Sequence, residues 1–327
     1  MLPCVTPVEI QPALAWSLHL RRLTPLLFAL AASTSSAQDK IKVDVNMVSV
    51  GFSVRDSRGA LVDTLTKDDL EIFEDGVAQR VAFFARSQDV PLTLGLIVDA
   101  SDSQEHFRKR HENDLEVFLK QVLGPKDRAY LLCFGNHLRL VNDFTQSASS
   151  MLENLKLYEK KTDRFPEIGP KEDRDLGTAF YDSIFYSVTQ KLAKEEGRKA
   201  LLVFSDGEDN SSSHDMMTTI ETAQAENVLV YTIRFTQPKR NGELTARNQY
   251  GIRVMDRIAK ETGAAHIDAK TTDPKTYFRQ IAEELRSSYE LAYYPTNHKK
   301  DNAFRKISVH PKNENLHVRM KTGYFAR

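Results

Sequence analysis

From residue 92 to about residue 287, short apolar runs alternate with longer stretches in which apolar residues have helical spacing, and this alternation limits the possible folds more than any other feature. The helical stretches include residues 113–122, 180–193, 216–226 and 274–287. The apolar runs, typical of strands, are residues 92–98, 129–134, 138–141, 200–205, 228–233 and 264–267. Strands that alternate with helices predict an α/β fold, here a doubly wound, mainly parallel sheet covered by helices on both faces.

Two β-rich segments flank this region. Residues 41–54 are rich in β-branched side chains, and residues 68–84 are predicted to form a hairpin, because Asp75-Gly76 supplies the positive φ of a tight turn. Short strands are also expected at residues 289–294, 304–309 and 316–320. We therefore expect a β-rich module at 38–90, an α/β domain at 91–287 and a β-rich segment at 288–327, with the two β segments as candidates to pack on each other.

The first 37 residues have the composition of a signal peptide. Arg21 and Arg22 precede a short apolar run at 23–32, and small residues follow at 33–37. This pattern predicts cleavage near Ala37 and an exported chain, periplasmic or secreted, with no membrane span after cleavage. An uncleaved membrane anchor is the alternative, although the apolar run is short for a span.

Oxygen-bearing side chains follow two of the predicted strands. Asp99, Ser101 and Ser103 lie on one loop directly after the strand at 92–98, Asp206 ends the strand at 200–205, and Thr178 lies between them in the chain. Open α/β sheets bind ligands beyond the carboxyl ends of their strands. An all-oxygen set suits a hard divalent cation, Mg²⁺ first, with Mn²⁺ or Ca²⁺ as substitutes. The alternative is that the aspartates only cap the helices that follow them.

These five residues, an Asp-x-Ser-x-Ser motif with a later Thr and a later strand-terminal Asp, resemble the metal-ion-dependent adhesion site of von Willebrand factor type A domains. The resemblance implies that Ser101, Ser103 and Thr178 touch the metal directly, whereas Asp99 and Asp206 act mainly through water. It also implies that an Asp or Glu from a partner protein completes the coordination of the ion.

The wider layout is similar to a group of exported, von Willebrand A-related bacterial proteins of acidobacterial type. The similarity is carried by residues 65–76 ahead of the domain, residues 176–182 within it, and residues 293–296 and 321–325 behind it. Asp102 is a departure, because members often have Gly there. Its carboxylate would either tighten metal binding or repel an acidic ligand.

Charge and motifs restrict the function. The chain has 45 basic and 45 acidic residues and no basic stripe, so we expect no nucleic-acid partner. The dinucleotide, phosphate-loop and His-Glu-x-x-His motifs are absent from the sequence. We expect a non-catalytic protein-binding module for adhesion. The alternatives are a structural assembly subunit that binds through strand edges with the metal site idle, and a Mg²⁺-dependent phosphoryl hydrolase.

Several further residues lead to separate expectations. His106 and His111 are five residues apart, which does not suit a zinc pair on a helix, so both are expected to be solvated. Asp182, one helical turn after Thr178, is either a hydrogen-bond acceptor behind the site or an exposed polar residue. Residues 208–210 are expected to be a solvated loop, and the charged segment 156–175 a loop that selects the partner. Cys133, in a strand-like run, is expected to be buried.

Overall fold

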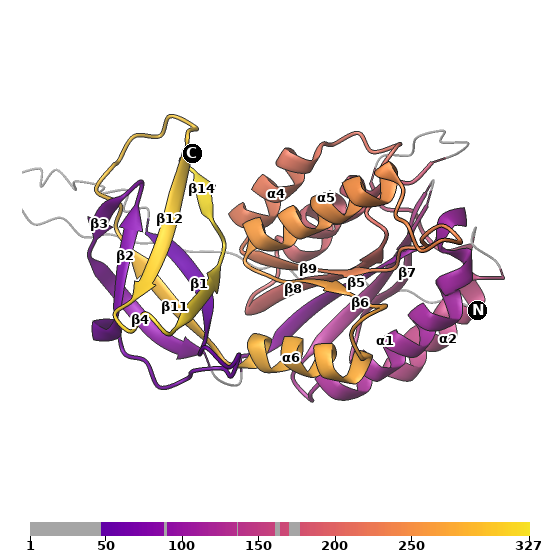
Figure 1. The fold of residues 1–327 in the computed structure, drawn as a ribbon, viewed down its shortest axis with the longest axis horizontal. Helices are drawn as coiled ribbons and strands as arrows, with labels where there is room; N and C mark the ends of the chain where they lie inside the picture. The colour runs from indigo at the N-terminus through magenta and orange to yellow at the C-terminus, as the bar shows by residue number, and fades with distance from the viewer. Residues whose placement is uncertain (1–46, 88–89, 136, 161–163, 170–176) are drawn as a thin grey trace, which may run out of the picture. The chain divides into compact units, whose positions relative to one another are not determined.

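A six-stranded sheet in the order β10-β9-β8-β5-β6-β7 forms the centre of the α/β region (Figure 1). The computed structural model describes residues 47–87, 90–135, 137–160, 164–169 and 177–327, so the predicted signal peptide lies outside the described residues. Neighbouring strands are parallel except for β6 and β7. The strands are β5 (Leu92–Asp99), β6 (Arg128–Phe134), β7 (Leu138–Thr145), β8 (Arg198–Ser205), β9 (Val228–Arg234) and β10 (His266–Asp268). This sheet confirms the α/β prediction.

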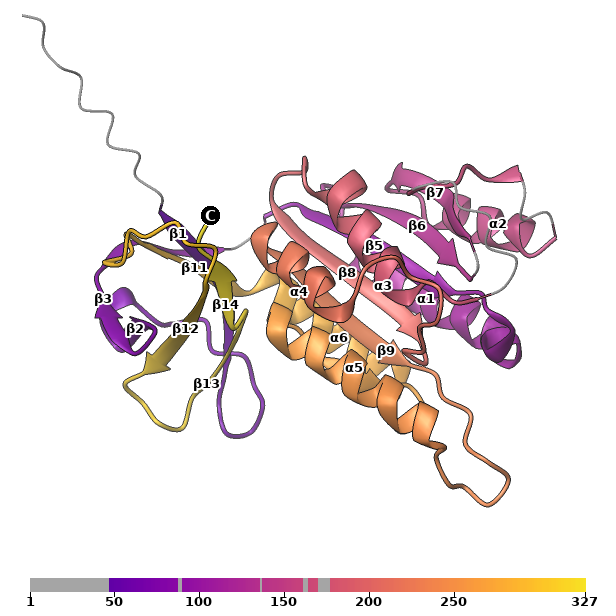
Figure 2. The same cartoon turned by 90° about the horizontal axis from the view of Figure 1, so that it is seen from above.

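Helices cover both faces of the sheet, as Figures 1 and 2 show. One face carries α1 (Arg108–Val122), α2 (Ala148–Tyr158) and α6 (Pro274–Arg286). The other carries α3 (Phe180–Tyr186), which continues into a π-helical turn (Ser187–Leu192), with α4 (Met216–Ala225) and α5 (Ala246–Thr262). Because helices lie on both faces, every residue of β5 is buried.

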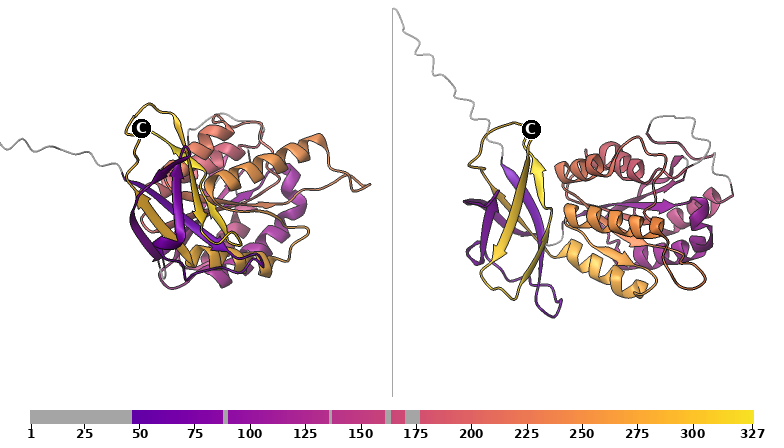
Figure 3. Two further views of the ribbon diagram at one scale, coloured as in Figure 1. Left: turned by 60° about the vertical axis from the view of Figure 1, so that its left-hand side comes forward. Right: turned by 45° about the horizontal axis from the view of Figure 1, so that its top comes forward.

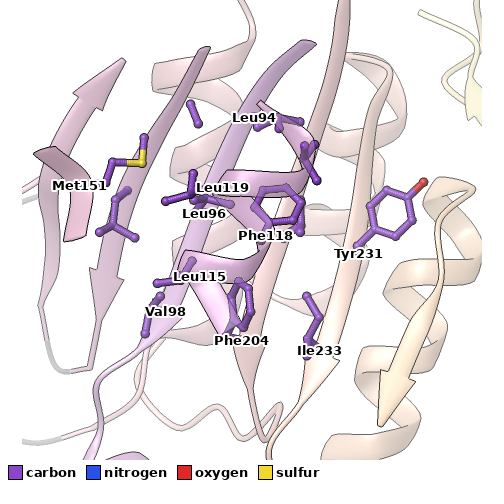
Figure 4. Packing of buried hydrophobic residues seen from close by; sticks show 14 of the residues in the cluster. Leu94, Leu96, Val98, Leu115, Phe118, Leu119, Met151, Phe204, Tyr231 and Ile233 are labelled. Atoms are coloured by element: carbon purple, nitrogen blue, oxygen red, sulfur yellow. The ribbon is translucent and has the colours of Figure 1, made fainter. Parts of the chain in front are cut away.

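The core on the α1 side is built from leucine and phenylalanine side chains. Figure 4 shows Phe118 and Leu119 of α1 packed over Leu94 and Leu96 of β5, and all four are nearly or fully buried. Burial of one such side chain stabilises the fold by about 1.5–3 kcal/mol. This core therefore fixes β5, whose last residue is Asp99, firmly against α1.

The two β-rich segments form one β-sandwich (Figure 3). Its two sheets have the orders β13-β1-β11-β4 and β14-β12-β2-β3. The strands are β1 (Val48–Arg55), β2 (Leu70–Glu74), β3 (Val77–Gln79), β4 (Val81–Ser87), β11 (Ser288–Tyr293), β12 (Phe304–Pro311), β13 (His317–Met320) and β14 (Gly323–Phe325), with a 3₁₀ turn at Lys67–Asp69 before β2. Since β4 and β11 are paired neighbours, the α/β region is inserted between two adjacent strands of the sandwich.

The predicted hairpin between β2 and β3 is confirmed. Asp75 and Gly76 have φ values of 49° and 81°, the left-handed pair that a two-residue hairpin turn requires. Across the sandwich, the buried carboxylate of Glu74 accepts hydrogen bonds from the hydroxyls of Tyr293 (2.7 Å) and Tyr324 (2.9 Å). These bonds join strands from the beginning and the end of the chain.

Two helices differ from the sequence-based expectations. The loop expected at 156–175 is wrong in its first part, because α2 extends to Tyr158, against which Phe165 packs; residues 161–163 and 170–176 lie outside the described residues. Helix α5 lies between two predicted strands, but its range was not among the named helical stretches. Its amino end is a capping box in which the Thr245 hydroxyl accepts from Asn248 N (3.0 Å) and Asn248 Oδ1 accepts from Thr245 N (3.0 Å).

The end of α6 connects the α/β region to the sandwich, and the described residues belong to one compact unit. Glu284 is buried and accepts hydrogen bonds from Ser53 Oγ (3.0 Å) and from Arg55 and Arg319 of the sandwich (3.3 and 2.8 Å). Arg286 forms an ion pair with Asp127 at the start of β6. Among the described helices, none combines the length and the apolar content needed to cross a bilayer.

Candidate metal centre

The two predicted aspartates lie at the carboxyl ends of neighbouring strands. Asp99 is the last residue of β5, and Asp206 directly follows β8, which pairs in parallel with β5. The chain continues from β5 to β6 on one side, whereas β8 lies on the other side, so this is the switch point at which α/β sheets bind ligands. Both carboxylates are almost completely buried, with exposed fractions of 1% and 4%.

The serines of the first loop connect the two strand ends. Ser101 N donates to Asp99 Oδ1 (3.0 Å), the hydroxyls of Ser101 and Ser103 lie 3.2 Å apart, and Ser103 Oγ donates to Asp206 Oδ2 (2.9 Å). The loop continues into a 3₁₀ turn (Asp102–Phe107) before α1. Asp99, Ser101, Ser103 and Asp206 therefore form one contiguous polar group.

Hydrogen bonds of the backbone at residues 178 and 179 hold Thr178 beside this polar group. Thr178 N donates to Asn210 Oδ1 (2.6 Å), and Asn210 N donates back to Thr178 O (3.1 Å). The next amide, of Ala179, donates to Gly135 O (3.0 Å), and a Cβ on Gly135 would lie 3.7 Å from Ser101 N. Thr178 is thus tied both to the loop after Asp206 and to the chain beside Ser101. Among the described residues, no hydrogen bond joins its hydroxyl to the other four side chains.

Two residues of the site were not predicted from the sequence. Ser205 Oγ donates to Asp99 Oδ2 (2.6 Å), and Gln104 Nε2 donates to Asp206 Oδ2 (2.8 Å). Gln104 is buried, and within the described chain its Oε1 has no hydrogen-bond partner. Ser205 precedes Asp206 and Gln104 follows Ser103 in the sequence, and this adjacency is the only sequence signal for a role of either residue in the site.

Burial makes this site electrostatically unfavourable without a cation. Burial and, second, the nearby Asp206 raise the pKa of Asp99 to about 7, although hydrogen bonds from Ser101 and Ser205 oppose the shift. Burial and Asp206 also raise the pKa of Glu208, which lies 3.5 Å from Arg247 Nε. A cation bound between the two strand ends would offset the repulsion between these carboxylates.

The side chains present fit a hard divalent cation. They offer carboxylate and hydroxyl oxygens, which are the ligands that Mg²⁺, Mn²⁺ and Ca²⁺ accept. In the part of the chain that the structure describes, no group of three or more His, Cys, Asp or Glu side chains is arranged to hold a metal. A cation here would therefore depend on the hydroxyls of Ser101, Ser103 and Thr178.

Asp182 holds the loop that follows Asp206. It is fully buried, and its carboxylate accepts from Ser213 N (3.0 Å), His214 N (3.0 Å) and His214 Nδ1 (2.7 Å). The exposed-residue alternative for Asp182 is wrong, because its carboxylate is buried and accepts hydrogen bonds from the loop that follows Asp206. The reason is that Asp182 lies on the side of α3 that contacts residues 213 and 214 of this loop.

Residues of the same loop in turn cap α3. Asp209 Oδ1 accepts from Tyr181 N (3.3 Å), and Ser212 Oγ accepts from Asp182 N (3.0 Å). Residues 208–210 form a loop in which Asn210 is exposed, as expected, but Asp209 and Asn210 also accept hydrogen bonds from neighbouring backbone amides. Their side chains satisfy free backbone amides at the start of α3 and at Thr178.

The expectation for the histidines is half right. His106 is exposed, but His111 has an exposed fraction of 2% and lies among the rings of Phe107, Phe204 and Phe235. Helix α1 begins at Arg108, so His111 belongs to its buried face, and burial lowers the pKa of this histidine to about 3. Cys133 is fully buried, as predicted.

No protein-family model matches the sequence, and no curated protein matches it. Solved structures with similarity include an aerotolerance-related membrane protein from Bacteroides fragilis (14% identity; 59% of this chain and 98% of that chain; TM-score 0.44). Another is manganese-loaded TRAP protein from Plasmodium vivax (13% identity; 73% of this chain and 96% of that chain; TM-score 0.43). A third is proximal thread matrix protein 1 from the mussel byssus with a zinc-occupied MIDAS motif (13% identity; 65% of this chain and 50% of that chain; TM-score 0.46). Identities and scores this low leave the function of this chain to be argued from its own residues.

Proposed function

We propose that this chain is an exported, non-catalytic protein-binding module that uses a divalent cation, Mg²⁺ in the first place, to capture an Asp or Glu side chain of a partner protein. The observation that carries the proposal is the 2.9 Å hydrogen bond from Ser103 to Asp206. It brings the motif loop after β5 and the carboxylate after β8 together, so that the predicted oxygen donors can act on one ion.

The hydrogen bonds of the site support a receptor for a carboxylate. Both oxygens of Asp99 accept protein hydrogen bonds, and Asp206 Oδ2 accepts two, so part of their negative charge is already satisfied. The remaining donors, Ser101, Ser103 and Thr178, are neutral hydroxyls. A divalent ion held in this way keeps excess positive charge, which an incoming carboxylate would neutralise.

The surface beside the site supports a protein as the ligand. Gly251 of α5 lies directly against Asp206, and the preceding turn carries Arg247 and Tyr250. The Tyr250 side chain is 52% exposed, and the Arg247 side chain is 71% exposed. Tyr and Arg contribute strongly to protein interfaces. The segment between β9 and α5 projects at this same edge (Figure 2).

Metal-dependent capture tests the proposal. The purified chain is immobilised and exposed to proteins of the native cell envelope with Mg²⁺, with EDTA, or with Mg²⁺ and an excess of free glutamate. We expect capture of a specific protein only with Mg²⁺, and reduced capture with glutamate. The Ser101→Ala/Ser103→Ala double variant should lose this protein, whereas Ser149→Ala, an exposed serine of α2, should retain it.

The other outcomes separate the alternatives. Capture that persists in EDTA and in the double variant would favour assembly through strand edges, with the metal site idle. Metal-dependent turnover of p-nitrophenyl phosphate by the chain, lost in the double variant, would favour the phosphoryl hydrolase. Either result would refute the adhesion proposal.

A further inference from the structure

A cavity of about 370 Å³ lies at the opposite end of β8 from the candidate metal centre. Its lining includes Arg198 and Lys199, the first residues of β8, and Val228, the first residue of β9. Strand residues Ser49 and Gly51 of the sandwich complete another side. The volume falls within the range of about 300–1,000 Å³ that is typical of small-molecule sites.

Arg198 is a partly buried cation that forms no ion pair with the described residues. No carboxylate of the described residues lies within 4 Å of its side chain, and Glu284 and Glu290 act on its charge only from farther away. One guanidinium nitrogen donates to the hydroxyl of Ser288, and Nε is buried with no partner in the described chain. A Cβ on Gly51 would lie 3.7 Å from Nη1, so the guanidinium lies against the bare backbone of β1. A partly buried cation with no carboxylate in direct contact would be stabilised by a ligand that supplies an anionic group.

Lys321 is a second cation in the same lining. It is 8% exposed and donates to two neutral oxygens, Gln224 O (3.1 Å) and Asn227 Oδ1 (2.6 Å). The first of these bonds caps the carboxyl end of α4. Since an ammonium group has three donors, one remains beyond these two bonds. Gln224 also lines the cavity, and its buried Oε1 has no partner among the described residues.

The acidic residues of the lining are engaged elsewhere. Glu195 forms an ion pair with Arg128, Glu226 lies 3.9 Å from Lys199, and Glu290 accepts from Ser49 Oγ (2.8 Å). These contacts leave partly buried Arg198 and buried Lys321 as the cations of the cavity for which the described residues offer no carboxylate within 4 Å.

We infer that this cavity binds a small organic anion, whose carboxylate or phosphate group is held by Arg198 and Lys321. The planar guanidinium of Arg198 can offer paired N–H donors to an oxyanion, and Lys321 adds a point charge. Hydroxyl and amide groups of the lining, including Gln224, would bind the polar remainder of the molecule. This site does not involve the metal centre, and its test is independent of the proposed function.

Calorimetric titration of the purified chain with citrate and, separately, with inorganic phosphate tests the inference, with chloride at equal ionic strength as the reference. We expect saturable binding of at least one of the two probes at one site per chain. Arg198→Gln should weaken this binding about thirtyfold or more, because loss of one partner of a buried charge pair costs about 2 kcal/mol or more. Arg198→Lys should weaken it less.

Two further variants keep the test decisive. Gly51→Val retains every cation and directs a side chain toward the guanidinium, so it should also weaken binding, even if Arg198→Gln does not fold. Arg234→Gln is the matched control, since Arg234 is a similarly buried arginine of β9 that already pairs with Asp268, and its variant should bind as the original chain does. The absence of saturable binding to either probe, or unchanged binding in both Arg198→Gln and Gly51→Val, would overturn the inference.

Discussion

Gly251→Ala is expected to destabilise the protein and weaken its metal site, although alanine is the better helix former. Gly251 lies inside α5, and a Cβ there would be 2.3 Å from the carbonyl oxygen of Asp206. Since comfortable contacts of this kind begin near 3.4 Å, the helix or the loop must move by about 1 Å. The loop that would move carries a candidate metal residue.

The expected magnitude follows from two opposing terms. Alanine in place of glycine within a helix stabilises by about 1 kcal/mol, whereas overpacking of this severity costs about 1–3 kcal/mol. We therefore expect the free energy of unfolding to fall by up to about 2 kcal/mol. Metal affinity should fall about 10–100-fold, the usual effect of disturbing groups that orient metal ligands.

Urea denaturation and calorimetric titration with Mn²⁺ measure the two effects. Gln249→Ala, an exposed position in the same helix, is the control and should change stability by no more than about 0.5 kcal/mol. If Gly251→Ala is more stable by about 1 kcal/mol and binds Mn²⁺ as before, the close approach of α5 to Asp206 is not the constraint that we describe.

Three further predictions concern single residues. Thr178→Ala should weaken partner capture more than Mn²⁺ binding, because the resemblance places this hydroxyl on the ion chiefly when ligand is bound; equal losses would contradict that role. His111 has a folded-state pKa of about 3 and an unfolded pKa near 6.5, so only the unfolded state takes up its proton between these values, and stability should fall by about 1.4 kcal/mol per unit as pH drops from 6.5 toward 3. His111→Phe should flatten this pH dependence of urea unfolding, and the exposed-site control His106→Gln should not; an unchanged slope in His111→Phe would refute the assignment. Burial raises the pKa of the Cys133 thiol, so a disulfide reagent should react with it only at the rate of unfolding, and fast labelling of the native chain would contradict its burial.

Sequence patterns predicted the elements whose causes are local. The apolar run before Asp99 and the one before Asp206 are long enough to define buried strands, and parallel strands place their carboxyl ends on one edge. Asp75-Gly76 specified its turn by its own conformational preference. These strands and this turn could be predicted because the preferences of their own residues determine them.

The missed features depend on long-range pairing. Ser205 reaches Asp99 because Val98 pairs with Phe204, and a register between strands more than a hundred residues apart cannot be derived from either strand alone. The same holds for β1 and β11, which join the ends of the chain in one sheet. Buried His111 was mispredicted because the start of α1 was placed too late in the chain.

Electron paramagnetic resonance of Mn²⁺ mixed with the purified chain tests the central claim most directly, because bound Mn²⁺ loses the sharp signal of the free aqueous ion. We predict one bound Mn²⁺ per chain, competitively displaced by Mg²⁺. The bound fraction should be lost in the Ser101→Ala/Ser103→Ala double variant and retained in Ser149→Ala. Mn²⁺ that stays free with the original chain, or binding that survives in the double variant, would contradict a cation site built on these hydroxyls.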